Sequence, residues 1–472
     1  MPSSDTGFRP VLELALQESL SHLEALDRNP VASTVDLATL RRRFDAPLPE
    51  AGTAAEQVIS ELVRDAEGGT IDSTGGRFFA WVVGGSLPAA LAADWLTAAW
   101  DQNATLFASG PAAAVVEETS GRWLKEILGL PAGASFAFVS GCQMAHTTCL
   151  AAARHHLLAH RNWNVEEQGL YGAPAIRILT NEQRHGTIER SLRLLGLGRG
   201  HLVDLPSDDQ GRLIPEVLRS ALEANSSAPT IVLLQAGDLN IGAFDSFAEL
   251  IPLAHQYGAW VHVDGAFGLW AGACPRLRHL VRGVELADSW ATDGHKWLNV
   301  PYDCGYAFVA HADAHRAAMS HRESYLVHDA EARDAIDWTP EWSRRARSFP
   351  TYAALRQLGR AGVADLVDRC CRHAHALVMG MGALPGAEVV WEPSINQGLV
   401  RFLDPHGATE AGHDAFTDRV VAEVLRTGEA YFSPTTWRGR RAMRVSVVNW
   451  QTSDADVARA IAAVSGVLRA RK

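Results

Sequence analysis

The stretch SWATDGHKWLNVPYDCG, residues 289–305, decides how this sequence is interpreted. It opens with a short run that is typical of a buried strand and continues into Asp293, His295 and Lys296. A lysine that follows a strand among apolar residues favours its uncharged form, and that free amine can attack a carbonyl group. The alternative is a lysine that lies along the surface and keeps its ammonium group in water.

The scarcity of lysine favours the reactive amine. The sequence contains only Lys125, Lys296 and Lys472, although lysine and arginine together number 43. Arginine keeps its charge in proteins and cannot supply a free amine. A reaction that needs an amine must therefore use one of these three residues, of which Lys472 is the last in the sequence.

Short apolar runs along the middle of the chain predict seven strands. Most of these runs are separated by segments in which apolar residues recur at helical spacing. This alternation predicts the α/β class, with a mostly parallel central sheet covered by helices. Ligands of such sheets bind at the carboxyl ends of the strands, so the residues after each strand are the first candidates for a site. The runs are 136–139, 176–179, 202–205, 231–234, 260–263, 289–292 and 306–309.

Changes in this pattern divide the chain into three expected parts. Residues 1–75 are expected to form an N-terminal helical arm, because apolar positions recur at helical spacing in 9–28 and again within 34–66. Residues 76–375 are expected to form the large domain that contains the sheet. Residues 376–472 are expected to form a small C-terminal α+β domain, with strands at 387–391, 399–402 and 443–448.

A second strand end carries a carboxylate. Asp264 ends the run AWVHVD and is followed by Gly265 and Ala266, which leave room for a flat ring. Its carboxylate could hold a ring nitrogen in the protonated form, since opposite charges stabilise each other in a partly buried site. A capping or turn aspartate is the common alternative.

Two more strand ends are candidates with weaker support. The turn Ser140-Gly141-Cys142 lies between a strand and a helix, so backbone N–H groups and the positive helix end point to one place. That arrangement suits a phosphate group, and a purely structural turn is an equal alternative. His185 follows the run at 176–179, and one histidine among 19 carries little weight alone.

Composition narrows the class of partner. The chain of 472 residues has a formal net charge of −11 and is 47% hydrophobic, which is typical of a globular protein with an acidic surface. Such a surface disfavours nucleic acid and anionic membranes as partners. We expect no signal peptide and no membrane-spanning segment. The six cysteines show no metal-binding spacing, so we expect no metal site and a reduced, cytoplasmic chain.

Taken together, these segments resemble the group II amino-acid decarboxylases that depend on pyridoxal 5′-phosphate (PLP). This family comprises the aromatic amino-acid, glutamate and histidine decarboxylases, and the resemblance runs from about Gly76 to the end of the chain. It implies fold type I of the PLP-dependent transferases and a homodimer with active sites at the subunit boundary. The segments that carry it are HVDGAFG at 262–268, HKWLNVPYDCG at 295–305, SRRARSFPTYAALRQLG at 343–359 and MRVSVVNWQTS at 443–453.

The resemblance also implies roles for individual residues. Lys296 would form the Schiff base with PLP, Asp264 would pair with the pyridine nitrogen, and His185 would stack on the ring. The expected cofactor contacts further include Ser140, Gly141, Cys142, Gln143, Asp238, Ala266 and His295, with Gly141, Cys142 and His295 around the phosphate. The expected substrate contacts are Phe79, Trp81 and Arg444, with Arg444 reaching a substrate carboxylate.

The chain departs from its relatives in two places near the expected cofactor. Relatives often have SGGTEAN where this chain has SGCQMAH at 140–146, so Gln143 replaces a hydroxyl residue. They often have AGTTNTGAFD where this chain has AGDLNIGAFD at 236–245, so Asp238 and Leu239 replace two threonines. Both changes bear on the substrate and the outcome of the reaction more than on PLP binding.

The activity implied by the resemblance is decarboxylation of an L-amino acid to the corresponding amine. Alternatives on the same scaffold are decarboxylation-dependent oxidative deamination to an aldehyde, a lyase reaction and a transferase reaction. A PLP-binding protein without catalysis is disfavoured by the complete set of Lys296, Asp264 and His185. Aromatic residues in the expected pocket favour an aromatic or other uncharged substrate, and arginine-rich stretches leave an acidic one open.

The segment Leu326–Trp342 is expected to form a mobile lid. In decarboxylases of this family the corresponding loop usually carries a tyrosine that returns a proton to the substrate carbon after CO₂ leaves. This segment contains no tyrosine, and Trp338, near the expected place, has an indole N–H that is a very poor acid. Either Tyr325 or His328 supplies the proton, or the reaction meets oxygen and ends in an aldehyde.

Overall fold

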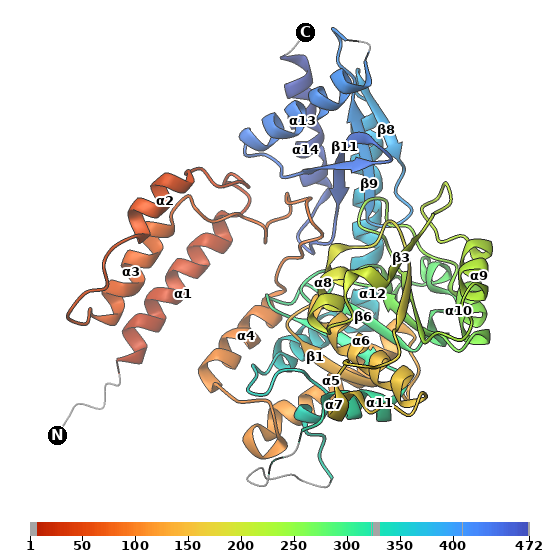
Figure 1. Ribbon diagram of the computed structural model, residues 1–472. Coiled ribbons are helices and arrows are strands. Elements are labelled where there is room, and N and C mark those ends of the chain that lie inside the picture. The colour runs from red at the N-terminus through yellow and green to blue at the C-terminus, as the bar shows by residue number, and fades with distance from the viewer. Residues whose placement is uncertain (1–6, 322, 324–330, 408, 471–472) are drawn as a thin grey trace, which may run out of the picture.

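The computed structural model describes residues 7–321, 323, 331–407 and 409–470 and combines a large sheet, a smaller C-terminal sheet and a helical arm (Figure 1). The large sheet has the strand order β1-β7-β6-β5-β4-β2-β3. In it β7 runs antiparallel to β1 and β6, and the other neighbours pair in parallel. Each of the seven predicted runs overlaps one strand. The strands are β1 (Ser135–Val139), β2 (Arg177–Asn181), β3 (Leu202–Leu205), β4 (Thr230–Gln235), β5 (Trp260–Asp264), β6 (Ser289–Asp293) and β7 (Gly305–Val309).

Alternate residues of the central strands face two different layers of helices. In β4, Ile231 and Leu233 pack into the apolar cluster shared with α6 and α8. Val232 and Leu234 pack into the cluster shared with α5, α9, α10 and α12. Because successive side chains point to opposite faces, a strand that is buried on both sides is apolar throughout. The helices are α4 (Pro88–Trp100), α5 (Pro111–Leu128), α6 (Cys142–Ala159), α7 (Val165–Gln168), α8 (Gly186–Leu194), α9 (Pro215–Glu223), α10 (Phe247–Gln256), α11 (Ala312–Met319) and α12 (Ser348–Gly382).

The smaller sheet is antiparallel and has the order β10-β11-β9-β8. Its strands are β8 (Ala387–Trp391), β9 (Gln397–Phe402), β10 (Ser433–Trp437) and β11 (Arg440–Ser446), and α13 (Glu410–Arg426) and α14 (Asp454–Arg469) accompany it. The sequence did not predict β10, whose residues SPTTW have little apolar character. It forms at the sheet edge by pairing along β11, a position where a proline is tolerated.

The helix α12 connects the two sheets. It packs against α4 and α5 near the large sheet and against β9 and α14 near the small one. Gly359 interrupts its helical geometry with a φ of 62°, a value that glycine adopts without steric cost. The expected domain boundary at 375/376 falls inside this helix.

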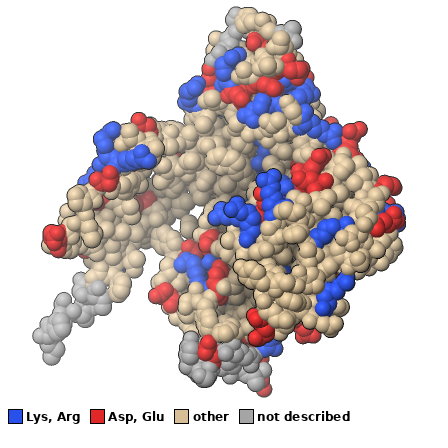
Figure 2. All heavy atoms as spheres, in the orientation of Figure 1, with Lys and Arg blue, Asp and Glu red and all other residues tan. Residues whose placement is uncertain are grey.

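The N-terminal arm lies to one side of the body (Figure 1) and consists of α1 (Phe8–Ala25), α2 (Leu37–Phe44) and α3 (Ala55–Ala66). None of its three helices contains a buried residue. In Figure 2 the charged side chains of the arm gather toward its two ends, and the stretch between them is mostly uncharged. The helix α1 exposes a stripe of large apolar side chains, which are Phe8, Leu12, Leu16 and Leu20 at 42–66% exposure. None of the helices in the described part of the chain has the length and apolar character of a membrane-spanning segment.

Candidate active site

A cavity of about 370 Å³ lies where the carboxyl ends of β4, β5 and β6 meet the first residues of α6. Its volume falls within the range of about 300–1,000 Å³ that is typical of small-molecule sites. The carboxyl ends of parallel strands are the expected place for a ligand in this fold class. Its lining consists of Trp81, Val82, Gly141, Cys142, Gln143, His185, Thr187, Gln235, Gly237, Leu239, Asp264, Ala266, Phe267, Asp293, His295, Lys296 and Arg444.

Lys296 reaches the cavity from the turn after β6. Its Nζ lies 3.3 Å from Oδ2 of Asp293 and 5.9 Å from the centre of the Phe267 ring. Asp293 is buried, and its Oδ1 accepts the backbone N–H of Cys142 at 2.6 Å. This carboxylate therefore joins the end of β6 to the start of α6 and holds the amine in place. Sequence reasoning did not select Asp293, although it is the last residue of the strand that Lys296 follows.

Lys125 has a different role. Its Nζ donates to the carbonyl oxygens of Ala132 at 2.5 Å and Ala134 at 2.6 Å, which closes the turn between α5 and β1. Burial lowers the pKa of Lys125. Its Nζ is nevertheless hydrogen-bonded to backbone oxygens and does not line the cavity. Lys472 lies outside the described residues. Lys296 is therefore the lysine that the described structure brings to the cavity.

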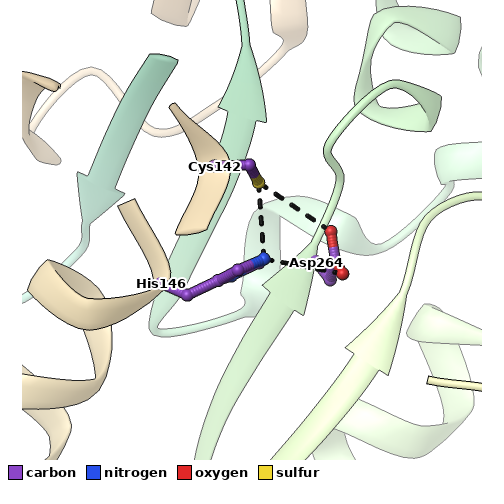
Figure 3. A group of neighbouring side chains, drawn as sticks. All are labelled: Cys142, His146 and Asp264. Carbon is purple, nitrogen blue, oxygen red and sulfur yellow. Dashed lines mark hydrogen bonds and ion pairs between the residues drawn. The ribbon is translucent and has the colours of Figure 1, made fainter. Parts of the chain in front are cut away.

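Asp264 ends β5 and faces several hydrogen-bond donors (Figure 3). Its Oδ1 accepts the backbone N–H of Ala266 at 3.1 Å and lies 3.9 Å from Sγ of Cys142. Its Oδ2 lies 3.5 Å from Nε2 of His146. Donors that converge on a carboxylate stabilise its charged form. An anionic Asp264 in the cavity wall suits a protonated ring nitrogen.

His185 stands at the mouth of the cavity as the N-cap of α8. Its Nδ1 accepts the backbone N–H of Thr187 at 3.3 Å. The surrounding atoms desolvate the ring in part and lower the pKa of His185, so the neutral imidazole is favoured. With Nδ1 acting as the acceptor, the proton of the neutral ring resides on Nε2 and can be donated to a bound carboxylate or hydroxyl group.

The start of α6 and His295 form the part of the cavity that suits a phosphate. Nδ1 of His295 accepts the backbone N–H of Cys304 at 3.2 Å, and its ring stacks on Tyr302 at 4.3 Å. A Cβ at Gly141 would come within 3.0 Å of the His295 ring, so only glycine fits there without movement. The N-terminus of an 18-residue helix offers positive partial charge to an anion. Of the predicted neighbours, Gln143 lines the cavity and Ser140 does not.

Arg444 enters the cavity from β11 of the smaller sheet. Its Nε donates to Oε1 of Gln397 at 2.9 Å, and Nε2 of Gln397 donates to the backbone oxygen of Asp238 at 3.1 Å. Burial lowers the pKa of Arg444 to about 10, opposed by the charge of Asp238, so the guanidinium remains charged at neutral pH. Within the described residues no acceptor engages its terminal Nη groups, which leaves them for a ligand.

Gln235 is a cavity residue that sequence reasoning missed. It ends β4 directly beside Asp264 in the sheet register. Its Nε2 is buried and has no hydrogen-bond partner among the described residues. A buried donor without a partner is costly unless a ligand supplies an acceptor. The position of Gln235 at a strand end was the available signal.

Two of the predicted contacts are not among the residues that line the cavity. The carboxylate of Asp238 accepts the backbone N–H groups of Asn240, Ile241 and Ala243, so it closes its own turn and does not line the cavity. Its neighbour Leu239 lines the cavity instead. Phe79 is fully buried and stacks on Phe432 at 5.3 Å, away from the lining.

Trp81 and Val82 form part of the rim in an unusual backbone conformation. Their φ angles are 55° and 59°. Positive φ at a β-branched valine is a genuine outlier, and such strain is concentrated at functional sites. The indole of Trp81 is 51% exposed and packs near Phe78 and Tyr431. A large apolar surface is thus held open beside the cavity.

The described part of the expected lid, residues 331–342, is anchored to the body. Oδ1 of Asp334 accepts the backbone N–H of Phe107 at 2.9 Å. Trp338 packs edge-on against His315 at 5.3 Å, its backbone oxygen lies 2.8 Å from Nε2 of that residue, and it does not line the cavity. The expectation that Trp338 stands in the place of a proton donor is therefore not supported. Tyr325 and His328 lie outside the described residues.

The groups that line the cavity fit PLP. The Lys296 amine suits an aldehyde, the Asp264 carboxylate suits a ring nitrogen, and the start of α6 with His295 suits a phosphate. The unpartnered Nε2 of Gln235 requires an acceptor that a polar cofactor can supply. This set of complementary groups around one cavity defines a PLP site of an enzyme with fold type I.

Comparison with known proteins identifies the family. The profile of the pyridoxal-dependent decarboxylase conserved domain matches residues 38–403, and the chain belongs to this family. It is 25% identical to the aromatic-L-amino-acid decarboxylase of Bacillus atrophaeus, covering 92% of this chain and 90% of that one. It is 24% identical to the 4-hydroxyphenylacetaldehyde synthase of Rhodiola rosea over the same shares. A crystal structure of Oryza sativa TDC with PLP and tryptamine superposes with a TM-score of 0.92 at 23% identity, covering 100% of this chain and 99% of that one.

These findings confirm the predicted family, fold and cofactor. The protein is a carboxy-lyase that depends on PLP. The relatives include both amino-acid decarboxylases and an aldehyde synthase by name, so the family alone leaves the substrate and the product open.

Proposed function

We propose that this protein removes CO₂ from an L-amino acid and releases the corresponding amine, with PLP attached to Lys296. The observation that carries this proposal is the meeting of Lys296, Asp264, His185 and Arg444 around one cavity of about 370 Å³. These four side chains come from three strand ends of the large sheet and one strand of the smaller sheet. A non-catalytic binding protein would need no such set.

When bound, PLP takes up the electron pair of whichever Cα bond lies perpendicular to its ring. The side chains that hold the substrate carboxylate decide which bond that is. In our proposal Lys296 binds the cofactor aldehyde, Asp264 holds the ring nitrogen, and His185 and Ala266 cover the two ring faces. Arg444 offers its charged Nη groups to a carboxylate of the substrate.

The substrate that we propose has an aromatic or other uncharged side chain. Trp81, Val82, Leu239 and Phe267 give the cavity an apolar part beside the polar groups. The exposed indole of Trp81 offers a large area for stacking. An acidic side chain would need a second cation beside Arg444, and Lys296 is committed to the cofactor in this scheme.

An aldehyde-forming reaction is the second candidate. One of the relatives is named as an aldehyde synthase. In the described part of the expected lid, Trp338 packs on His315 and does not line the cavity, and no tyrosine occurs in that part. A reaction intermediate without a nearby acid lives longer and has time to meet oxygen.

The two candidates are separated by a panel of amino acids with aromatic, aliphatic, acidic and diamino side chains. Products are identified by mass spectrometry, and oxygen uptake is recorded in the same reactions. We expect an amine and CO₂ in equal amounts from an aromatic substrate, without oxygen uptake. Ammonia and an aldehyde formed with oxygen uptake would establish the second candidate. Failure of every amino acid to change the absorbance of the bound cofactor would contradict both.

We also propose a homodimer, which the arm supports. The stripe of Phe8, Leu12, Leu16 and Leu20 along α1 is too apolar to be left in water by a single subunit. Sedimentation should show a dimer, and Leu16→Asp should weaken it. Gln17→Asp places the same charge on the same helix beside the stripe and serves as the control. A fully active monomer would contradict the proposal.

We further propose that the protein is located in the cytoplasm. Its six cysteines are free, buried thiols, which fits a reducing compartment.

A further inference from the structure

A chain of buried polar side chains leads from Asp264 into the large sheet. Oδ2 of Asp264 lies 3.5 Å from Nε2 of His146, and Nδ1 of His146 lies 2.9 Å from Nε2 of His262. Nδ1 of His262 lies 2.9 Å from Oγ of Ser289, which also accepts the indole N–H of Trp260 at 2.9 Å. Figure 3 shows His146, together with Cys142, directed at the Asp264 carboxylate.

The members of this chain are inaccessible to solvent. His146, His262 and Ser289 are 0% exposed, and Trp260 is 2% exposed. None of the four lines the cavity, so none can contact the cofactor or the substrate directly. Polar groups placed this deep are costly unless every one is hydrogen-bonded, and a satisfied network is rigid.

The indole N–H at one end and the carboxylate at the other favour one direction of hydrogen bonding along these side chains. The indole N–H of Trp260 can only donate, and an ionised carboxylate can only accept. Because Ser289 Oγ accepts from Trp260, its own hydrogen is available to Nδ1 of His262. His262 can then donate from Nε2 to Nδ1 of His146. Nε2 of His146 thereby carries its hydrogen, which faces Oδ2 of Asp264 at 3.5 Å and Sγ of Cys142 at 3.4 Å. In the opposite direction Nε2 of His146 would accept from the Cys142 thiol, and Asp264 would lose this N–H.

Both imidazoles remain neutral in this arrangement. Burial lowers the pKa of His146 to about 3 and that of His262 to about 3. A neutral donor stabilises a carboxylate without adding a positive charge that would repel a protonated ring nitrogen. These side chains therefore direct a neutral N–H at Asp264 and add no positive charge beside it. The protonated ring nitrogen of the cofactor can then be the positively charged partner of the carboxylate.

We propose that Trp260, Ser289, His262 and His146 form a positioning relay that holds Asp264 as a carboxylate and thereby keeps the cofactor ring nitrogen protonated. This inference rests on the proposed pairing of Asp264 with that nitrogen. The four residues act through Asp264 and are positioning residues. Their removal should lower the affinity for PLP and the fraction of protonated ring nitrogen together.

A metal ion is the alternative use of the same place. Donor atoms of Cys142, His146 and Asp264 all lie within 4.8 Å of one another. A thiol binds metal as the thiolate, but burial and the nearby Asp293 and Asp264 raise the pKa of Cys142 well above its usual value. An ion there would also occupy the carboxylate that the cofactor needs. The relay accounts for the placement of His146 beside Asp264 without an ion.

The direct test uses the holoenzyme loaded with PLP that carries ¹⁵N in the ring, whose NMR shift reports protonation of that nitrogen. The wild type should show the protonated signal, and Asp264→Asn should lose it. His146→Leu and His262→Leu should each shift the signal toward the unprotonated form. Ser289→Ala should have the same effect in a weaker form. His262→Asn keeps a donor and an acceptor and should retain part of the wild-type signal.

Titration of the apoenzyme gives a second readout. His146→Leu should raise the dissociation constant for PLP about 10- to 100-fold, as is typical when a group behind a primary ligand is removed. With the cofactor analogue in which carbon replaces the ring nitrogen, the difference between wild type and His146→Leu should shrink to about threefold or less. If His146→Leu only disturbed the structure of the site, the change in the dissociation constant would be the same for PLP and for the analogue.

His315→Leu is the matched control. His315 is also 0% exposed, has its pKa lowered by burial to about 3, and is hydrogen-bonded to Ser135 and to the Trp338 backbone. This variant should lose stability and leave the ring-nitrogen signal unchanged. If Asp264→Asn keeps the protonated signal, the proposed pairing fails, and the relay fails with it. If Asp264→Asn loses the signal while both leucine variants of the relay keep it, the relay alone is wrong. Loss of the wild-type signal on dialysis against EDTA would also overturn the relay, because a metal would then hold Asp264.

Discussion

The polar side chains at the two ends of the large sheet differ in whether they have hydrogen-bond partners. At the amino end, Asp288 precedes β6 and receives hydrogen bonds from His255 at 3.0 Å, from His311 at 2.9 Å and from the backbone N–H of Val261 at 2.6 Å. At the carboxyl end, the Nη groups of Arg444, which reaches this end from the smaller sheet, and the uncharged amide Nε2 of Gln235 have no hydrogen-bond partner among the described residues.

This difference separates stability from function within one sheet. A buried charge with several partners is satisfied and stabilises the fold. Donors without partners are costly in the free protein and become useful only when a ligand supplies acceptors. The carboxyl end of the sheet is therefore prepared for a ligand, whereas Asp288 at the amino end is fully paired without one.

The largest effect that tests this contrast is expected for the two lysines. Lys296→Ala should lose the visible absorption band of bound PLP, the covalent link that borohydride traps, and activity by at least about 10³-fold. Lys125→Ala should keep all three, and it should lose about 1–3 kcal/mol of stability because two carbonyl oxygens lose their donor. Absorbance spectra and denaturant unfolding check both. A covalent PLP adduct that persists in Lys296→Ala would contradict the assignment.

A second test exchanges one aspartate at each end of the sheet. Asp264→Asn should weaken PLP binding and lower turnover by about 10²- to 10³-fold, since the ring nitrogen loses its anionic partner. Asp288→Asn should leave cofactor affinity unchanged and reduce stability by about 1–3 kcal/mol. Cofactor titration and chemical unfolding of both variants give the comparison. Near-normal activity in Asp264→Asn would show that the functional end of the sheet has been misassigned.

A smaller effect is expected at Arg444. Arg444→Lys keeps the charge and loses the planar pair of Nη donors, so KM should rise about 10- to 100-fold with a smaller change in kcat. Arg441→Lys is the control on the same strand, because Arg441 is paired with Asp418 on the outer surface. Steady-state kinetics with the best substrate of the panel measures the split. An unchanged KM would mean that Arg444 does not contact the substrate.

The last effect is a pH dependence of stability with opposite sign at the two ends. Burial raises the pKa of Asp245, beside β4 at the carboxyl end, to about 6. A raised acid contributes stability that is complete below pH 3.8 and is lost as the pH rises through about 6. Relative to wild type, Asp245→Asn should therefore gain up to about 3 kcal/mol between pH 4 and pH 7.

Asp288 should behave in the opposite way. Burial acts to raise its pKa, but the hydrogen bonds from His255 and His311 outweigh burial and hold the pKa of Asp288 below its usual value. Its contribution is present above pH 3.8 and is lost as the pH falls through the lowered value. Asp288→Asn should thus cost more at pH 7 than near pH 3. If the free energies of unfolding of the two variants, measured in denaturant and relative to wild type, changed with pH in the same direction, the proposed contrast would be wrong.

Six of the seven strands of the large sheet were predictable because each is a largely apolar run that is buried on both faces. The edge strand β3 was predicted from its apolar residues, although Val203 and Asp204 are exposed. The strand β10 was not, because a short edge strand is specified by its pairing with β11 and not by its own residues. The same limit applies to the long helix α12, which crosses the expected boundary at 375/376 because it packs on both sheets.

The site was predictable where chemistry and strand ends coincide. Lys296, Asp264 and His185 each follow a strand, and all three line the cavity. Asp238 follows a strand as well, yet its carboxylate is taken up by three backbone N–H groups of its own turn. Local hydrogen bonding of this kind cannot be distinguished from ligand binding in a sequence.

The sequence by itself determined the family, the α/β fold and the cofactor, because short motifs and the alternation of strands and helices are local properties. Only the tertiary structure decided which polar groups are hydrogen-bonded within the protein and which remain available to a ligand. His146 and His262 lie far apart in the chain and come within 2.9 Å of each other behind Asp264. Among the described residues, none that the fold brings near Gln235 accepts a hydrogen bond from its Nε2. Burial and pairing depend on residues that the fold brings together, and no local pattern contains them.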